Sequence, residues 1–146
     1  MRLTAILLTL AILAVPTLSA AKDESIPQLI TRAESARLED RPQIYAEIAE
    51  LQLRNADQLY NQGKADEAEA AIKDVVAYSD KAADAATKSG KKLKNTEIAV
   101  RKMAEKLRDI KRSLSFDDQP PVQTAIEHLE ALRTDLLNHM FGKGAK

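Results

Sequence analysis

The chain has 146 residues, carries 22 basic and 22 acidic side chains, and contains neither cysteine nor tryptophan. This length suits one domain with a modest core, and the lack of cysteine excludes disulfides, thiolate metal sites and c-type haem attachment. Aromatic residues make up only 3% of the chain, so Leu, Ile, Val and Ala must form the core, a composition that favours packed helices over a β-sandwich.

The N-terminal segment has the pattern of an export signal. Arg2 precedes an apolar run from Leu3 to Val15, and Ser19 and Ala21 fit the small-residue rule for signal cleavage. The apolar run is short for a membrane span. We therefore predict a signal peptide over residues 1–21, cleaved after Ala21, and a periplasmic or secreted protein. An uncleaved anchor is the alternative.

Capping residues mark the predicted helix starts. Ser25, Asp40 and Asp118 each stand just ahead of a proline, which the first helical turn tolerates. Gln28 and Gln43 lie at the capping-box position after the first two of these residues.

Two glycines, Gly63 and Gly90, stand where a left-handed residue would end a helix. Together these signals predict a short helix over residues 26–38 and four long helices over about 41–62, 66–88, 91–115 and 120–141.

Apolar residues recur within these segments at helical spacing. The clearest stripe comprises Leu93, Thr96, Val100, Met103, Leu107, Ile110 and Leu114. For the helix over 41–62 the predicted stripe is Ile44, Ile48, Leu51, Asn55 and Leu59. Phe116 and Phe141, at helix ends, are expected to plug the ends of the core.

Four long helices of similar length with short connections predict an all-α fold. We expect an antiparallel up-down four-helix bundle over residues 40–141. A short extra N-terminal helix precedes it within residues 22–39, and residues 142–146 form a flexible tail.

The turn after the helix over 41–62 is similar to the turn of a tetratricopeptide repeat (TPR). The matching residues are Gln62, Gly63, Asp66, Glu67, Ala68 and Ile72. The resemblance covers about residues 52–80 and occurs once, whereas stacked arrays need about three repeats. It implies a single helical hairpin of TPR-like character.

The segment 91–112 carries nine basic and three acidic residues, and acidic segments flank it. It lacks the interleaved aromatic residues of a nucleic-acid site, so we expect no nucleic-acid partner. A solvated bundle face and a contact with an anionic surface remain open. The candidate partner-binding residues are Lys91, Lys92, Lys94, Arg101, Lys102, Arg108 and Arg112.

The two histidines, His128 and His139, are too far apart along one helix to share an ion, although His139 and Asp135 are one turn apart. Exported four-helix bundles can hold haem between a His and a Met, so His139 and Met103 are the candidate haem ligands. The "NQGKADEAEAA" turn also resembles that of cytochrome b562-type proteins. We nevertheless expect no cofactor and no metal. The chain has no nucleophile paired with a base and no phosphate loop, so we do not expect an enzyme.

The sequence thus predicts an exported helical binding or scaffolding module that acts by protein–protein interaction. One alternative is a peripheral binder of an anionic envelope surface through residues 91–112, which would contact the membrane surface without spanning it. The other is a haem- or metal-carrying four-helix bundle. Self-association is open, because Ala82, Ala83, Ala85 and Ala86 permit close helix contacts.

Overall fold

The structure, a computed structural model, describes residues 23–142, and within this range the chain is helical and contains no strand. This confirms the predicted all-α class. The elements are α1 (Ile26–Ser35), α2 (Arg41–Asn61), α3 (Ala65–Ser89), α4 (Leu93–Ser113), a 3-10 turn (Phe116–Asp118) and α5 (Gln119–Phe141). The predicted signal peptide over residues 1–21 and all but the first residue of the predicted tail lie outside the described residues.

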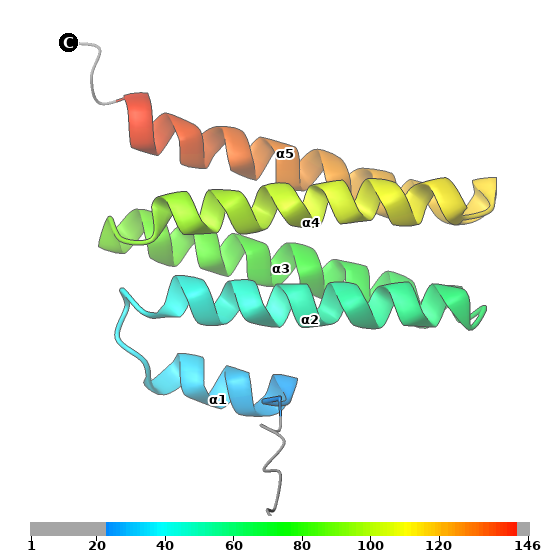
Figure 1. The fold of residues 1–146 in the computed structure, drawn as a ribbon, viewed down its shortest axis with the longest axis horizontal. Helices are drawn as coiled ribbons and strands as arrows, with labels where there is room; N and C mark the ends of the chain where they lie inside the picture. Colours follow the sequence, from blue (N-terminus) through cyan, green and yellow to red (C-terminus); the bar gives the residue numbers. More distant parts are fainter. Residues whose placement is uncertain (1–22, 143–146) are drawn as a thin grey trace, which may run out of the picture.

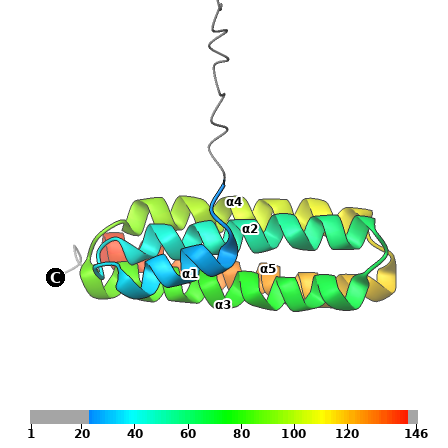
Figure 2. The ribbon, with the colours of Figure 1, turned by 90° about the horizontal axis from the view of Figure 1, so that it is seen from below.

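The five α-helices pack together, with α2 to α5 side by side as long rods (Figure 1). α2 and α4 form one layer and α3 and α5 the other (Figure 2). α1 packs against α2. Among residues 23–142, no helix combines the length and apolar character needed to span a bilayer.

The main core lies between α2, α3, α4 and α5. The predicted stripe of α4 contributes the buried residues Val100, Met103, Leu107 and Ile110, while Leu93 and Leu114 pack at its margins. Apolar spacing of three and four residues brings these side chains to one side of the helix, so burying them accounts for most of the stability of α4.

A second, smaller core cluster lies under α1. Leu29 and Ala33 of α1 pack against Ile44 and Ile48 of α2, and Leu51 lies at the edge of this cluster. The apolar stripe predicted for α2 therefore does not describe the side of α2 that faces the main core. Its first three members face α1, whereas Ala49, Leu53 and Ala56 face α3 to α5 and Asn55 is exposed.

The start of α1 forms the predicted capping box. Ser25 Oγ accepts from Gln28 N at 3.4 Å, and Gln28 Oε1 accepts from Ser25 N at 2.9 Å. α1 ends at Ser35 rather than at residue 38, because Ala36 is extended. Asp40 does not cap α2. Its carboxylate accepts instead from Arg37 Nε at 3.1 Å.

The turns before α3 and α4 use left-handed residues. Gly63 and Gly90 have φ values of 73° and 65°, as their positions predicted. Lys92 also has a positive φ, 62°, and α4 therefore begins at Leu93 rather than at residue 91. A side chain in this region is sterically disfavoured, so Lys92 is a strained position.

The prediction that two phenylalanines plug the ends of the core is wrong. Phe116 is 84% exposed and Phe141 is 74% exposed. Tyr60 of α2, in contrast, is partly buried at the edge of the core, near Asp118 of the turn between α4 and α5. Burial raises the pKa of its phenol, and the nearby carboxylates of Asp118 and Glu69 raise this pKa further.

Candidate functional site

The seven predicted basic residues do not form one face of α4. Successive residues of a helix differ by about 100° in direction, so Arg101 and Arg108 lie on the flank toward α5 whereas Lys102 lies on the flank toward α2. Lys91 and Lys92 belong to the turn before α4, and Lys94 and Arg112 stand near its two ends.

The arginines of this set are paired with acids of the same molecule. Arg108 Nη2 lies 2.6 Å from Glu130 Oε1 of α5, and Arg112 pairs with Asp109. Arg101 lies 3.8 Å from Glu97 and 3.6 Å from Glu105. Much of the positive charge predicted from the sequence is therefore compensated within the molecule.

Glu97 is the buried member of this group. Its side chain is only 10% exposed, and its Oε1 accepts from Arg133 Nε of α5 at 2.7 Å. The hydrogen bond to Glu97 raises the pKa of the Arg133 guanidinium, against a smaller lowering by desolvation. This pair links α4 to α5 and is part of the packing, not of an open site.

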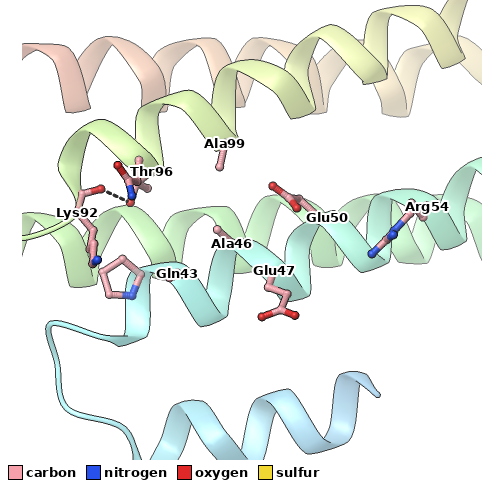
Figure 3. A pocket seen from close by; sticks show the side chains of 10 residues that line it. Gln43, Ala46, Glu47, Glu50, Arg54, Lys92, Thr96 and Ala99 are labelled. Carbon is pink, nitrogen blue, oxygen red and sulfur yellow. Dashed lines mark hydrogen bonds between the residues drawn. The ribbon is translucent and has the colours of Figure 1, made fainter. Parts of the chain in front are cut away.

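A hollow of about 480 Å³ lies between the first halves of α2 and α4 (Figure 3). Ala46 of α2 and Ala99 of α4 face it with methyl groups only, which leaves the space between the two helices unfilled. Lys92 stands at one end of the hollow, and its carbonyl accepts from Thr96 Oγ1 at 2.9 Å.

A second hollow, of about 420 Å³, adjoins the first and shares Glu50 and Arg54 with it. Beyond these residues Lys106 Nζ lies 2.8 Å from Asp57 Oδ2, so this ion pair joins α4 to α2. We refer to the two hollows together as the α2–α4 groove, lined by Gln43, Ala46, Glu50, Arg54, Lys92, Asn95, Ala99 and Lys102.

The groove carries charges that the molecule does not compensate. Within residues 23–142, Glu50, Arg54, Lys92 and Lys102 form no ion pair, and all four are exposed. Glu47 also lines the first hollow, but its side chain points toward α1, where its Oε2 lies 3.0 Å from Arg32 Nη2 (Figure 3). The groove therefore presents a carboxylate between cations, with a floor of small residues.

Two of the predicted basic residues, Lys92 and Lys102, line this groove. The charged α2 residues that line it, Glu50 and Arg54, were not predicted from the sequence. The sequence feature that could have indicated the groove is the pair of small residues Ala46 and Ala99, because two alanines that face each other across a helix contact leave space between the helices. Their meeting depends on α2 and α4 being neighbours, which the spacing of residues along either helix does not reveal.

The histidines occupy the other side of the molecule. His128 Nε2 lies 2.7 Å from Asp80 Oδ1 of α3, while His139 Nδ1 lies 2.9 Å from the backbone oxygen of Asp135. Among the described residues, no three His, Asp or Glu side chains gather in a way that could hold a metal ion. Met103 is buried in the main core, whereas His139 is exposed.

An apolar hollow of about 420 Å³ also lies between α3 and α5. Ile72 and Val76 of α3 and Ala125 of α5 line it, and His128 stands beside them. Its charged groups are paired within the molecule, Lys73 with Glu69 and His128 with Asp80. The α2–α4 groove, whose charges are unpaired, is therefore the stronger candidate for binding a partner.

Comparison of the chain with protein-family models, with curated proteins and with solved structures found no match. The candidate site therefore rests on its own geometry and charge.

Proposed function

We propose that this protein is an exported binding or scaffolding module that engages a protein partner through the α2–α4 groove. The observation that carries the proposal is the set of uncompensated charges at this groove, in a molecule that pairs the arginines of α4 internally. A groove with a floor of small residues and charges at its rim suits a helix whose own charges are complementary.

A protein is favoured over an anionic envelope surface because Glu50 lies between the cations of the groove. A uniformly negative surface would bring like charge against this carboxylate, whereas a protein can place a cation there. Sedimentation with vesicles of anionic phospholipid distinguishes the two. Vesicle binding that Glu50→Lys strengthens and salt abolishes would favour the surface-binding alternative.

The partner is tested by pull-down from an envelope extract. Ala99→Arg fills the groove floor, and Ala131→Arg places the same side chain at an exposed position of α5 as a matched control. We expect specific capture by the wild type and by Ala131→Arg, with loss of capture by Ala99→Arg. Equal capture by both variants, or none by the wild type, would contradict the proposal. Circular dichroism verifies that both variants fold.

We also propose that α2 to α5 form an antiparallel up-down four-helix bundle, with α1 as an added helix. The short connections, residues 62–64, 90–92 and 114–118, support this arrangement. Because the chain has no cysteine, Gln62→Cys and Ser115→Cys can be spin-labelled without background. In this topology the two labels lie at the same end, whereas labels at residues 62 and 89 are separated by roughly 35 Å, the length of a helix of this size.

Export is tested separately by N-terminal sequencing of protein recovered from the periplasm or the culture medium. We expect the mature chain to begin at Lys22. Recovery of a chain that retains residues 1–21 would favour the uncleaved anchor.

A further inference from the structure

We propose that this protein also docks end-on to a membrane surface that contains anionic phospholipid. One end of the molecule makes the contact, through unpaired lysines and exposed apolar side chains that lie there together. This role goes beyond the proposed function, because the α2–α4 groove stays open to a protein partner while the end of the molecule meets the lipid.

Three segments of the chain meet at this end (Figure 1). The start of α2 and the turn between α3 and α4 are neighbours, because Pro42 and Lys92 line the same hollow. The last turns of α3 and α5 are also neighbours, because Thr87 and His139 line another hollow. Residues that are far apart in the sequence therefore meet the same surface.

The turn between α3 and α4 gives this end its positive charge. Its lysines are exposed and form no ion pair within residues 23–142: Lys91, Lys92 and Lys94. Residues 36–41, which join α1 to α2, contain two arginines and two acids and add no net charge. Lys88 Nζ lies 2.8 Å from Asp84 Oδ2, so this pair adds none either. Among the described residues, the unpaired acids on the adjoining helix turns are Glu34 and Asp135, and the three lysines outnumber them.

Apolar side chains are exposed beside these lysines. Phe141, in the last turn of α5, is 74% exposed, and Leu38, in the linker between α1 and α2, is 42% exposed. In the sequence, Lys143 and Lys146 follow Phe141. Apolar insertion combined with several cations supplies the two kinds of attraction that hold a peripheral protein on anionic lipid. We name this surface the basic end, formed by Leu38, Lys91, Lys92, Lys94 and Phe141.

The opposite end of the molecule has the reverse charge. Its exposed or partly exposed charged residues without an ion pair in the described chain are four acids and one lysine: Asp66, Glu67, Asp117, Asp118 and Lys64. An anionic membrane therefore attracts one end and repels the other, which orients the molecule before contact.

This contact differs from the side-on contact that the sequence predicted for residues 91–112. Arg101, Arg108 and Arg112 are paired with acids of the same molecule, and Lys102 lies on the flank toward α2. The cations of α4 beyond its first turn therefore do not form one positive face that a flat surface could meet. The lysines of the basic end have no such pairs.

Co-sedimentation with vesicles tests the proposal. The chain from Lys22 onward is used, because the apolar run from Leu3 to Val15 would bind lipid by itself. We expect binding at low salt to vesicles of equal parts phosphatidylglycerol and phosphatidylcholine, a decrease as salt rises, and no binding to pure phosphatidylcholine. Each lysine near an anionic surface strengthens binding about fivefold. Lys91→Glu combined with Lys94→Glu should therefore weaken binding at least about twentyfold.

The two exposed phenylalanines provide a matched pair, because Phe116 lies at the opposite end from Phe141 (Figure 1). Phe141→Ser should weaken vesicle binding at least about fivefold, whereas Phe116→Ser should leave it unchanged. The chain has no tryptophan, so Phe141→Trp provides a single fluorescent reporter. Its emission should shift to shorter wavelength with the anionic vesicles, and that of Phe116→Trp should not.

Lys64→Glu combined with Lys102→Glu is the control for net charge, since it reverses two unpaired lysines outside the basic end. This variant should bind vesicles within about twofold of the wild type, and circular dichroism verifies that every variant folds. Absence of wild-type binding, equal binding to pure phosphatidylcholine, or equal losses in the two double variants would overturn the proposal. An unshifted emission of Phe141→Trp would do the same.

A second copy of the chain is the competing occupant of the basic end. In that case both Phe141→Ser and Phe116→Ser would abolish self-association measured without vesicles, and no vesicle binding would be seen, which would also overturn the proposal. Failure here is distinguishable from failure of the proposed function, because loss of envelope-protein capture by Ala99→Arg is measured without lipid vesicles.

Discussion

Replacing Lys92 with glycine is expected to stabilise the protein, although it removes a side chain. Lys92 has a φ of 62°, and a residue with a Cβ loses about 1–2 kcal/mol in this left-handed region. Glycine avoids that strain but adds freedom to the unfolded chain, which costs about 0.5–1 kcal/mol. The expected net gain is about 0.5–1 kcal/mol, or about 2–5 °C in the midpoint of thermal unfolding.

Thermal and urea unfolding followed by circular dichroism measure this gain. Lys92→Ala is the control, because alanine removes the charge but keeps the Cβ and the strain, and its effect should stay within about 0.5 kcal/mol. The backbone oxygen of residue 92, which accepts from Thr96 N at 2.9 Å, is present in both variants.

The converse change is Gly90→Ala, at a φ of 65° with no atom within 4 Å of the added Cβ. It isolates the conformational cost and should destabilise by about 1 kcal/mol. If Lys92→Gly proves no more stable than Lys92→Ala, strain at this turn is not the cause and the reasoning fails.

Three further changes test the packing. Leu107 has no exposed surface, so Leu107→Ala should lower the free energy of unfolding in urea by about 2–5 kcal/mol. The control Leu38→Ala, at a residue that is 42% exposed, should change this free energy by at most about 0.5 kcal/mol. Similar losses for the two variants would contradict the assignment of Leu107 to the core. The pKa of Tyr60 is raised in the folded chain above its ordinary 10.0, so the folded chain keeps a proton that the unfolded chain loses. Stability from this group is complete below pH 10 and falls as pH rises above it; Tyr60→Phe should flatten that fall in urea titrations between about pH 9 and 11.5, and an unchanged slope would refute the assignment. In a double-mutant cycle, Arg133→Met should destabilise the wild-type protein more than it destabilises the Glu97→Ala variant. Equal effects in the two backgrounds would show that Arg133 and Glu97 do not stabilise the fold through their interaction.

Helix positions could be predicted from the sequence because their signals are local. Ser25 with Gln28, and the glycines at 63 and 90, specify starts and ends within one turn of the chain. The stripe of α4 was also correct, since α4 buries one continuous side. The error at Lys92 has a local cause too, because a lysine rarely adopts the left-handed conformation and its sequence context carried no sign of it.

The assignment of faces failed where a helix has more than one neighbour. α2 packs on α1 through Ile44 and Ile48 and on the main core through Leu53 and Ala56. Apolar residues therefore surround much of this helix, and periodicity alone cannot divide them between two partners. The basic residues of α4 were grouped as one face for a different reason, because the step of about 100° between adjacent residues such as Arg101 and Lys102 was not applied to them; the structure shows which flank each one takes.

By itself the sequence determined that residues 23–142 are helical and, apart from the end of α1 and the two ends of α4, where the helices begin and end. It could do so because hydrogen bonds and apolar spacing within a helix involve residues only three or four positions apart. Only the tertiary structure decided which cations are neutralised, that Phe116 and Phe141 stay exposed, and that Ala46 and Ala99 face each other across a groove. Those outcomes depend on which helices become neighbours and at what offset. That choice arises from contacts between residues far apart in the chain, which no local pattern encodes.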